Sequence, residues 1–131
     1  MRTKQGHTPP QVFTHYLDAI TSQRWEELPQ LYAPDAIVEH PLGPDAHRIL
    51  HGRSELLEHF TALHNLGLRL NVSDIVVHDT GNPEVIIAEF TYHGTVRTGT
   101  AAQQHIRRRN IFVITVRNGQ IVSSRDYQGD A

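Results

Sequence analysis

The first half of the chain carries apolar residues at the spacing of amphipathic helices. Thr8 followed by Pro9 and Pro10 is a typical helix start, because a hydroxyl can cap free amides and prolines at the first positions lose no hydrogen bond. The apolar stripe that predicts this first helix consists of Val12, Phe13, Tyr16, Leu17 and Ile20.

Two further helices are predicted, separated by a short strand. The second helix starts at about Gln23 and ends at Pro34. The third opens at Gly52 and stops at residues 65–67. Between them, residues 36–40 indicate a strand, and the prolines that follow force a turn into a loop that reaches Leu50.

The second half of the chain changes to strand patterns. Residues 68–72 alternate in polarity, and residues 75–78 either continue that strand or start another. Longer strands are predicted at 85–96, 103–116 and 120–128, and Asn118-Gly119 joins the last two as a tight hairpin. Helices followed by antiparallel strands indicate an α+β domain, in which a curved sheet wraps around three N-terminal helices. We expect residues 1–131 to form this single domain.

The composition excludes several classes of function. A net charge of −2 with 20% charged residues gives no field that would attract nucleic acid or an anionic membrane. Without cysteine the chain has no disulfide, thiol nucleophile or thiolate metal site. Its apolar runs are too short to span a bilayer, and none follows the basic N-terminus. We therefore expect a cytoplasmic protein with no nucleic-acid or membrane partner.

Three segments resemble one known superfamily. They are residues 32–43 (YAPDAIVEHPLG), residues 51–60 (HGRSELLEHF) and residues 117–127 (RNGQIVSSRDY). Together with the order of elements, they resemble the nuclear-transport-factor-like proteins, in particular the branch of SnoaL-like polyketide cyclases and ketosteroid isomerase-like proteins. The resemblance implies a cone-shaped barrel and a homodimer formed through the sheet.

The resemblance also implies three catalytic residues. In the isomerases the residue before the proline of the first segment is the catalytic carboxylate, a position held here by His40. Their oxyanion-hole tyrosine lies on the first helix, and the same separation of 24 residues before His40 leads to Tyr16. The acid-base residue proposed for the closing hairpin of SnoaL-like and phenazine biosynthesis A/B proteins corresponds to Asp126. The isomerases' second oxyanion donor is an acid, for which Asn110 would be a neutral substitute.

These residue types suit acid-base catalysis next to a carbonyl, which needs a base and donors for the developing oxyanion. A histidine of pKa about 6.5 titrates closer to neutral pH than an aspartate of about 3.9. Asp126 shares a strand face with Ser124, and if that face points inward we expect its charge to raise the pKa of His40. The alternatives are a His40 bonded to the backbone, an outward Asp126 paired with an arginine, and a Tyr16 that only fills the core.

A second group of side chains is expected to contact the substrate, namely Trp25, Phe60, Tyr92, His105 and Arg107. Tyr92 alternates with His93, so one of the two faces the cavity, and His105 shares a strand face with Arg107. No cofactor or metal is expected. The pair His59 and His64 has i, i+5 spacing, off one helical face, and His47 with His51 lies in a predicted loop.

The sequence therefore predicts a cofactor-independent isomerase or cyclase that acts on a small, largely apolar carbonyl compound of polyketide type. Two alternatives stay open. One is epoxide opening as in limonene epoxide hydrolases, which share the cone and use an Asp-Arg-Asp arrangement. The other is a small-molecule binding protein without catalysis, which a cavity that excludes His40 would favour.

Overall fold

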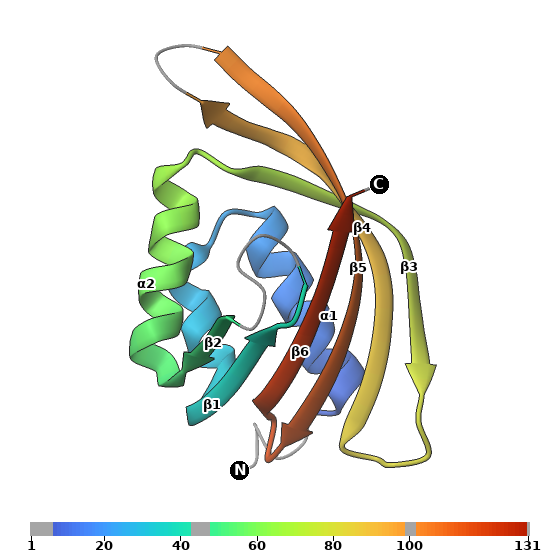
Figure 1. Ribbon diagram of the computed structural model, residues 1–131. Coiled ribbons are helices and arrows are strands. Elements are labelled where there is room, and N and C mark those ends of the chain that lie inside the picture. Colours follow the sequence, from blue (N-terminus) through green and yellow to red (C-terminus); the bar gives the residue numbers. More distant parts are fainter. Residues whose placement is uncertain (1–6, 43–47, 99–101, 131) are drawn as a thin grey trace.

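Three helices lie on one side of a six-stranded sheet that curves around them (Figure 1). This computed structural model describes residues 7–42, 48–98 and 102–130. The helices are α1 (Pro9–Thr21), the 3-10 helix η2 (Trp25–Leu31) and α2 (Gly52–Asn65). The strands are β1 (Tyr32–His40), β2 (Arg48–His51), β3 (Arg69–Asp79), β4 (Val85–Thr98), β5 (Ala102–Arg117) and β6 (Gln120–Asp130). Neither α-helix of the described residues is long and apolar enough to cross a membrane.

The strand order is β2-β1-β6-β5-β4-β3, and β3 to β6 form the predicted antiparallel meander. The sheet is mixed only where β1 runs parallel to β6. Within the described residues, β2 and β3 are its two edges and no ladder joins them. The α+β class and the curved, mostly antiparallel sheet are thus confirmed, while the expected barrel remains open along one side.

The first helix begins as its sequence predicts. Thr8 and Gln11 form a reciprocal capping box, in which each side chain bonds the other residue's backbone N–H. The second helix differs, because it is a seven-residue 3-10 helix with Pro29 inside it. Proline cannot donate the backbone hydrogen bond that a continuing α-helix needs, which favours a short and tighter helix.

The segment after η2 is more extended than predicted. β1 starts at Tyr32 rather than at residue 36, and the expected loop ends in the short strand β2. Pro34 is compatible with this strand because the β1–β6 register is interrupted between Tyr32 and Ile37. Residues 43–47, which include His47, lie outside the described residues.

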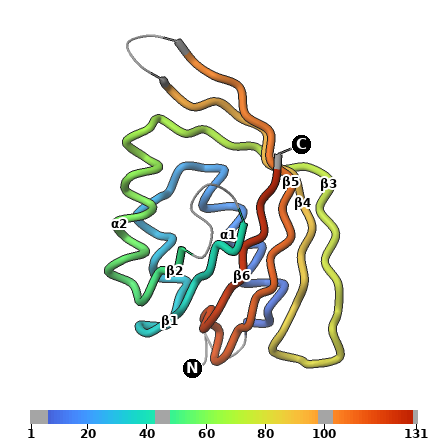
Figure 2. Tube along the Cα trace, viewed as in Figure 1, coloured from blue at the N-terminus to red at the C-terminus, as the bar shows by residue number. Residues whose placement is uncertain are grey.

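The later strands follow the sequence closely. Residues 69–79 form one strand, with an irregularity between Ser73 and Val76 where Asp74 adopts a φ of 56°. Asn118 and Gly119 have φ values of 54° and 75°, as the predicted tight hairpin requires. Figure 2 shows that the paired ends of β4 and β5 extend past the rest of the sheet.

Candidate active site

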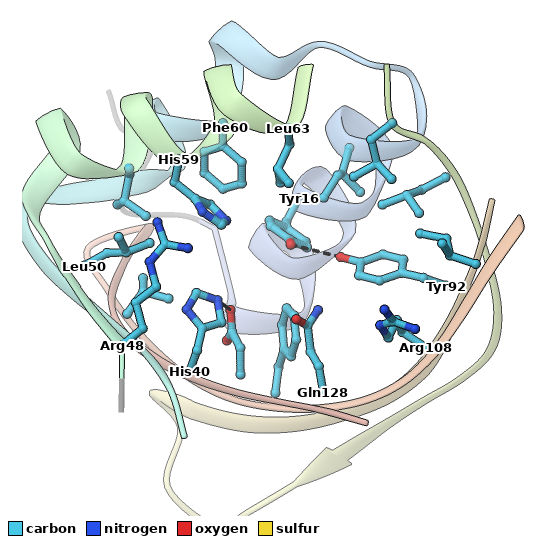
Figure 3. A pocket seen from close by; sticks show the side chains of 18 of the residues that line it. Tyr16, His40, Arg48, Leu50, His59, Phe60, Leu63, Tyr92, Arg108 and Gln128 are labelled. Carbon is cyan, nitrogen blue, oxygen red and sulfur yellow. Dashed lines mark hydrogen bonds and ion pairs between the residues drawn. The ribbon is translucent and has the colours of Figure 1, made fainter. Parts of the chain in front are cut away.

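A cavity of about 780 Å³ lies between the helices and the concave face of the sheet. Its apolar lining comes from both α-helices and most strands, and includes Ile20, Leu50, Leu56, Leu63, Leu70 and Phe112. Tyr16, His40 and Asp126 all line it as well. The three residues implied to be catalytic therefore meet in one largely apolar space (Figure 3).

Strand register brings His40 and Asp126 together. Glu39 pairs with Arg125 across the parallel β1–β6 ladder, so the next residue of each strand points to the opposite, inward face. His40 Nε2 lies 3.7 Å from Asp126 Oδ2, and their side chains are 17% and 8% exposed. This separation is within ion-pair range and is longer than a hydrogen bond.

Burial gives Asp126 an unusual affinity for protons. It raises the pKa of this carboxyl to about 7, although a hydrogen bond from the Ser124 hydroxyl acts in the opposite direction. Ser124 and Asp126 therefore share one face of β6, as the alternation predicted, and the structure shows that this face points inward. With a pKa of about 7, this carboxyl is able to donate a proton near neutral pH.

His40 departs from the expected electrostatics. Burial first, and then the positive charge of Arg48, lower the pKa of His40 below 6.5. The expectation that Asp126 would raise this pKa was wrong, because burial and the Arg48 charge together lower it. The Nδ1 atom of His40 is buried and has no hydrogen-bond partner among the described residues.

Two phenols form the polar centre of the same cavity. The hydroxyls of Tyr16 and Tyr92 lie 2.9 Å apart in a buried hydrogen bond, with the Tyr16 ring against Phe112 (Figure 3). Burial raises the pKa of both phenols, and their proximity to Asp126 raises it further. Since one hydroxyl donates within the pair, the proton of the other is free to reach a ligand.

The expected substrate contacts divide into two groups. Phe60 and Tyr92 line the cavity, and the alternative residue His93 points the other way and bonds Ser73. Trp25, in contrast, is buried in the core outside the lining. His105 and Arg107 are exposed on the outer face of β5, so the expectation that they contact a substrate here is corrected.

Neighbours of these residues line the cavity instead. Ile106 and Arg108 face inward on β5, because alternate residues of a strand point to opposite faces. Asn110 shares that face and is 2% exposed, with its side-chain amide bonded to the Arg108 carbonyl. Asn110 is not among the described residues that line the cavity, so the structure gives no support for a role as oxyanion donor.

The sequence interpretation missed His59 on α2 and Arg48 on β2. The rings of His59 and His40 have centroids 5.6 Å apart, and burial lowers the pKa of His59 to about 4. A signal for His59 was available, since it completes the apolar stripe of Leu56, Phe60 and Leu63 at helical spacing. No such signal existed for Arg48, which lies on a strand that the pattern did not indicate.

The fold and this site define an α+β protein with acid-base groups inside an apolar cavity. Residues 13–124 match the SnoaL-like domain, and the chain belongs to that family. A PhzA/B-like protein of Pseudomonas aeruginosa is 30% identical over 100 residues, which cover 74% of this chain and 67% of that protein.

Solved structures agree on the architecture. A proposed isomerase from Bacillus subtilis matches with a TM-score of 0.81 at 20% identity, covering 92% of this chain and 85% of that one. A proposed polyketide cyclase from Pseudomonas putida matches with a TM-score of 0.79 at 20% identity, covering 93% and 92%. At these identities the likeness establishes the fold alone.

Proposed function

We propose that this protein is an acid-base isomerase or cyclase that needs no cofactor and acts on a small, largely apolar carbonyl compound. The observation that carries the proposal is the convergence of His40, Asp126 and the phenol pair in one cavity. Membership of the SnoaL-like family and the likeness to a proposed polyketide cyclase support this class of reaction.

In the proposed mechanism, neutral His40 removes a proton from the carbon next to the carbonyl. Its lowered pKa keeps the imidazole unprotonated at neutral pH, so the base is ready to act. When the Tyr92 hydroxyl donates to the Tyr16 oxygen, the Tyr16 proton is available for a ligand. Tyr16 then donates a hydrogen bond to the oxyanion that forms.

Asp126 supplies the second proton transfer. With a pKa of about 7, the carboxyl is able both to donate a proton to a product carbon or alkoxide and to recover one afterwards. Its position 3.7 Å from His40 allows the two groups to exchange the proton within the cavity. The apolar side chains of the lining limit the contact of bulk water with the enolate.

The experiment is exchange of the protons next to the carbonyl of 2-tetralone in D2O, followed by NMR. The wild-type protein should accelerate exchange, and His40→Ala and Asp126→Asn should each reduce the rate by roughly 10² or more. Tyr16→Phe should reduce it by about 10² through loss of one oxyanion donor.

Matched controls remove the same groups outside the cavity. His64→Ala deletes an exposed imidazole of α2, and Glu39→Gln neutralises a carboxylate on the opposite face of β1. Both should exchange at the wild-type rate. Exchange by wild type no faster than by His40→Ala, across a panel of bicyclic ketones, would contradict the proposal and favour a binding protein.

One observation favours epoxide opening as a second candidate. Arg108 lies inside the cavity on β5, the strand next to that of Asp126, so an inward arginine and a carboxyl are both present. Asp126 is, however, the only carboxyl of the described lining, where limonene epoxide hydrolases use two. Incubation with limonene oxide in ¹⁸O-labelled water separates the candidates, since only epoxide hydrolysis yields a labelled diol.

A further inference from the structure

Arg48 and His40 occupy opposite positions in the antiparallel pairing of β2 with β1. Residues opposite each other in such a pair point to the same face of the sheet, and both side chains line the cavity. Since His40 in turn lies beside Asp126 on β6, a row of three ionisable side chains crosses β2, β1 and β6. Figure 3 shows the Arg48 guanidinium directed toward the rings of His40 and His59.

This guanidinium has no acidic partner among the described residues. Two other arginines form ion pairs, Arg24 with Asp18 and Glu27, and Arg117 with Glu84. Arg48 instead faces two imidazoles, and its charge lowers the pKa of each of them. Histidines with lowered pKa values are neutral at pH 7, so among the described residues this end of the cavity carries one positive charge, that of Arg48, without an acidic partner.

The remaining charge of the lining does not balance Arg48. Asp126 is the only carboxyl of the described lining, and burial raises its pKa to about 7, which favours the uncharged form. Arg48 is itself exposed, as is Leu42, another residue of the lining, so the cavity is open to solvent at these side chains. An anionic group could therefore enter there without losing all its hydration.

We propose that the ligand carries a carboxylate, and that Arg48 and His59 bind this group at the open end of the cavity. A guanidinium matches the planar carboxylate with two parallel hydrogen bonds, and a neutral imidazole adds one N–H donor. The substrate is then an oxo-carboxylic acid rather than a neutral ketone, with its apolar body between the carboxylate and the phenol pair. The inference rests on the proposed function, which sets the carbonyl at Tyr16.

The test is calorimetric titration at neutral pH with 6-hydroxy-2-naphthoate and with its methyl ester. Both probes offer a phenol oxygen in place of an enolate and the same apolar body, and only one is an anion. We expect wild type to bind the carboxylate about tenfold more tightly than the ester, a preference that weakens as NaCl is added. Arg48→Gln should reduce the preference to about one, and Arg48→Lys should restore part of it.

Arg107→Gln is the matched control, because it removes a guanidinium from the exposed outer face and should keep the wild-type preference. Equal binding of the two probes by wild type, a preference that survives in Arg48→Gln, or failure of both probes to bind would each overturn the inference. The proposed function fails separately: ketone exchange would then not be accelerated, even if the preference for the carboxylate were present.

Discussion

Two ionisable residues of the cavity make opposing contributions to stability. Burial raises the pKa of Asp126 from 3.8 to about 7, so the native state binds more protons than the unfolded chain between these values. This contribution falls as pH rises from about 4 to about 7. The pKa of His59 is lowered from 6.5 to about 4, so the unfolded chain binds more protons there, and stability rises with pH over that interval. The lowered pKa of His40 adds to the effect of His59.

We predict that single substitutions separate these two contributions. In Asp126→Asn the free energy of unfolding should rise with pH between about 4 and 6.5, because only the histidine effect remains. In His59→Asn the slope of the free energy of unfolding against pH should be lower than in wild type between about 4 and 6.5, because one of the two histidine contributions that oppose Asp126 is lost. The slope from Asp126 is on the order of 1 kcal/mol per pH unit. Urea unfolding from pH 4.5 to 8 measures the difference.

Asp35→Asn is the control for this prediction. Asp35 is an exposed carboxyl on β1, and its substitution should leave the pH profile of wild type unchanged. If Asp126→Asn also followed the wild-type profile, Asp126 would not be held in its protonated form. The proposed role of Asp126 as a proton donor near pH 7 would then be lost.

At the scale of elements, β3 and β4 approach each other closely at Gly94. A Cβ atom added at Gly94 would lie 1.9 Å from the backbone oxygen of Arg69. That atom belongs to a strand backbone, so it cannot move aside as a flexible side chain would. Leu70 and Val96, which flank this crossing, both line the cavity, so the approach also shapes its wall.

We predict that Gly94→Ala lowers the free energy of unfolding by about 2 kcal/mol or more, because the two strands must separate to admit the methyl group. Gly129→Ala is the matched control, since no atom lies within 4 Å of a Cβ added there and it should be nearly neutral. Chemical denaturation of both variants gives the comparison. Equal stability of the two would mean that β3 and β4 approach each other less closely.

At the scale of the molecule, the outer face of the sheet carries apolar side chains with no cover in the monomer. Ile37, Ile49, Val76 and Ile111 are 41–49% exposed and come from four strands. Glu39 and Arg125, of opposite charge, lie side by side on the same face. We propose that this face joins two copies of the chain. An isologous interface packs the apolar patch of one copy against that of the other, and it allows Glu39 of each copy to pair with an arginine of the other.

We predict that Ile111→Asp converts a dimer into a monomer in analytical ultracentrifugation, because it places a charge within the proposed apolar interface. Leu57→Asp, at an equally exposed apolar residue of α2, should leave the dimer intact. A wild-type protein that sediments as a monomer at micromolar concentration, or equal behaviour of the two variants, would contradict the proposal.

The sequence by itself determined the elements and most of their faces. Helical spacing predicted α1 and α2, the Asn118-Gly119 pair predicted the hairpin, and strict alternation placed Asp126 beside Ser124 on one face. These signals are local, because each depends on the chain geometry of a few consecutive residues. Where a signal was ambiguous, as for η2 with its internal Pro29, the boundary or helix type was missed.

Only the tertiary structure decided which faces point into the cavity and which residues meet there. Alternation shows that Arg107 and Arg108 point in opposite directions, but it does not say which one is inside. The row of Arg48, His40 and Asp126 depends on the register between strands that are far apart in the sequence. The pKa values of His40 and Asp126 follow from that packing, since burial and neighbouring charge are properties of the assembled fold rather than of a residue type.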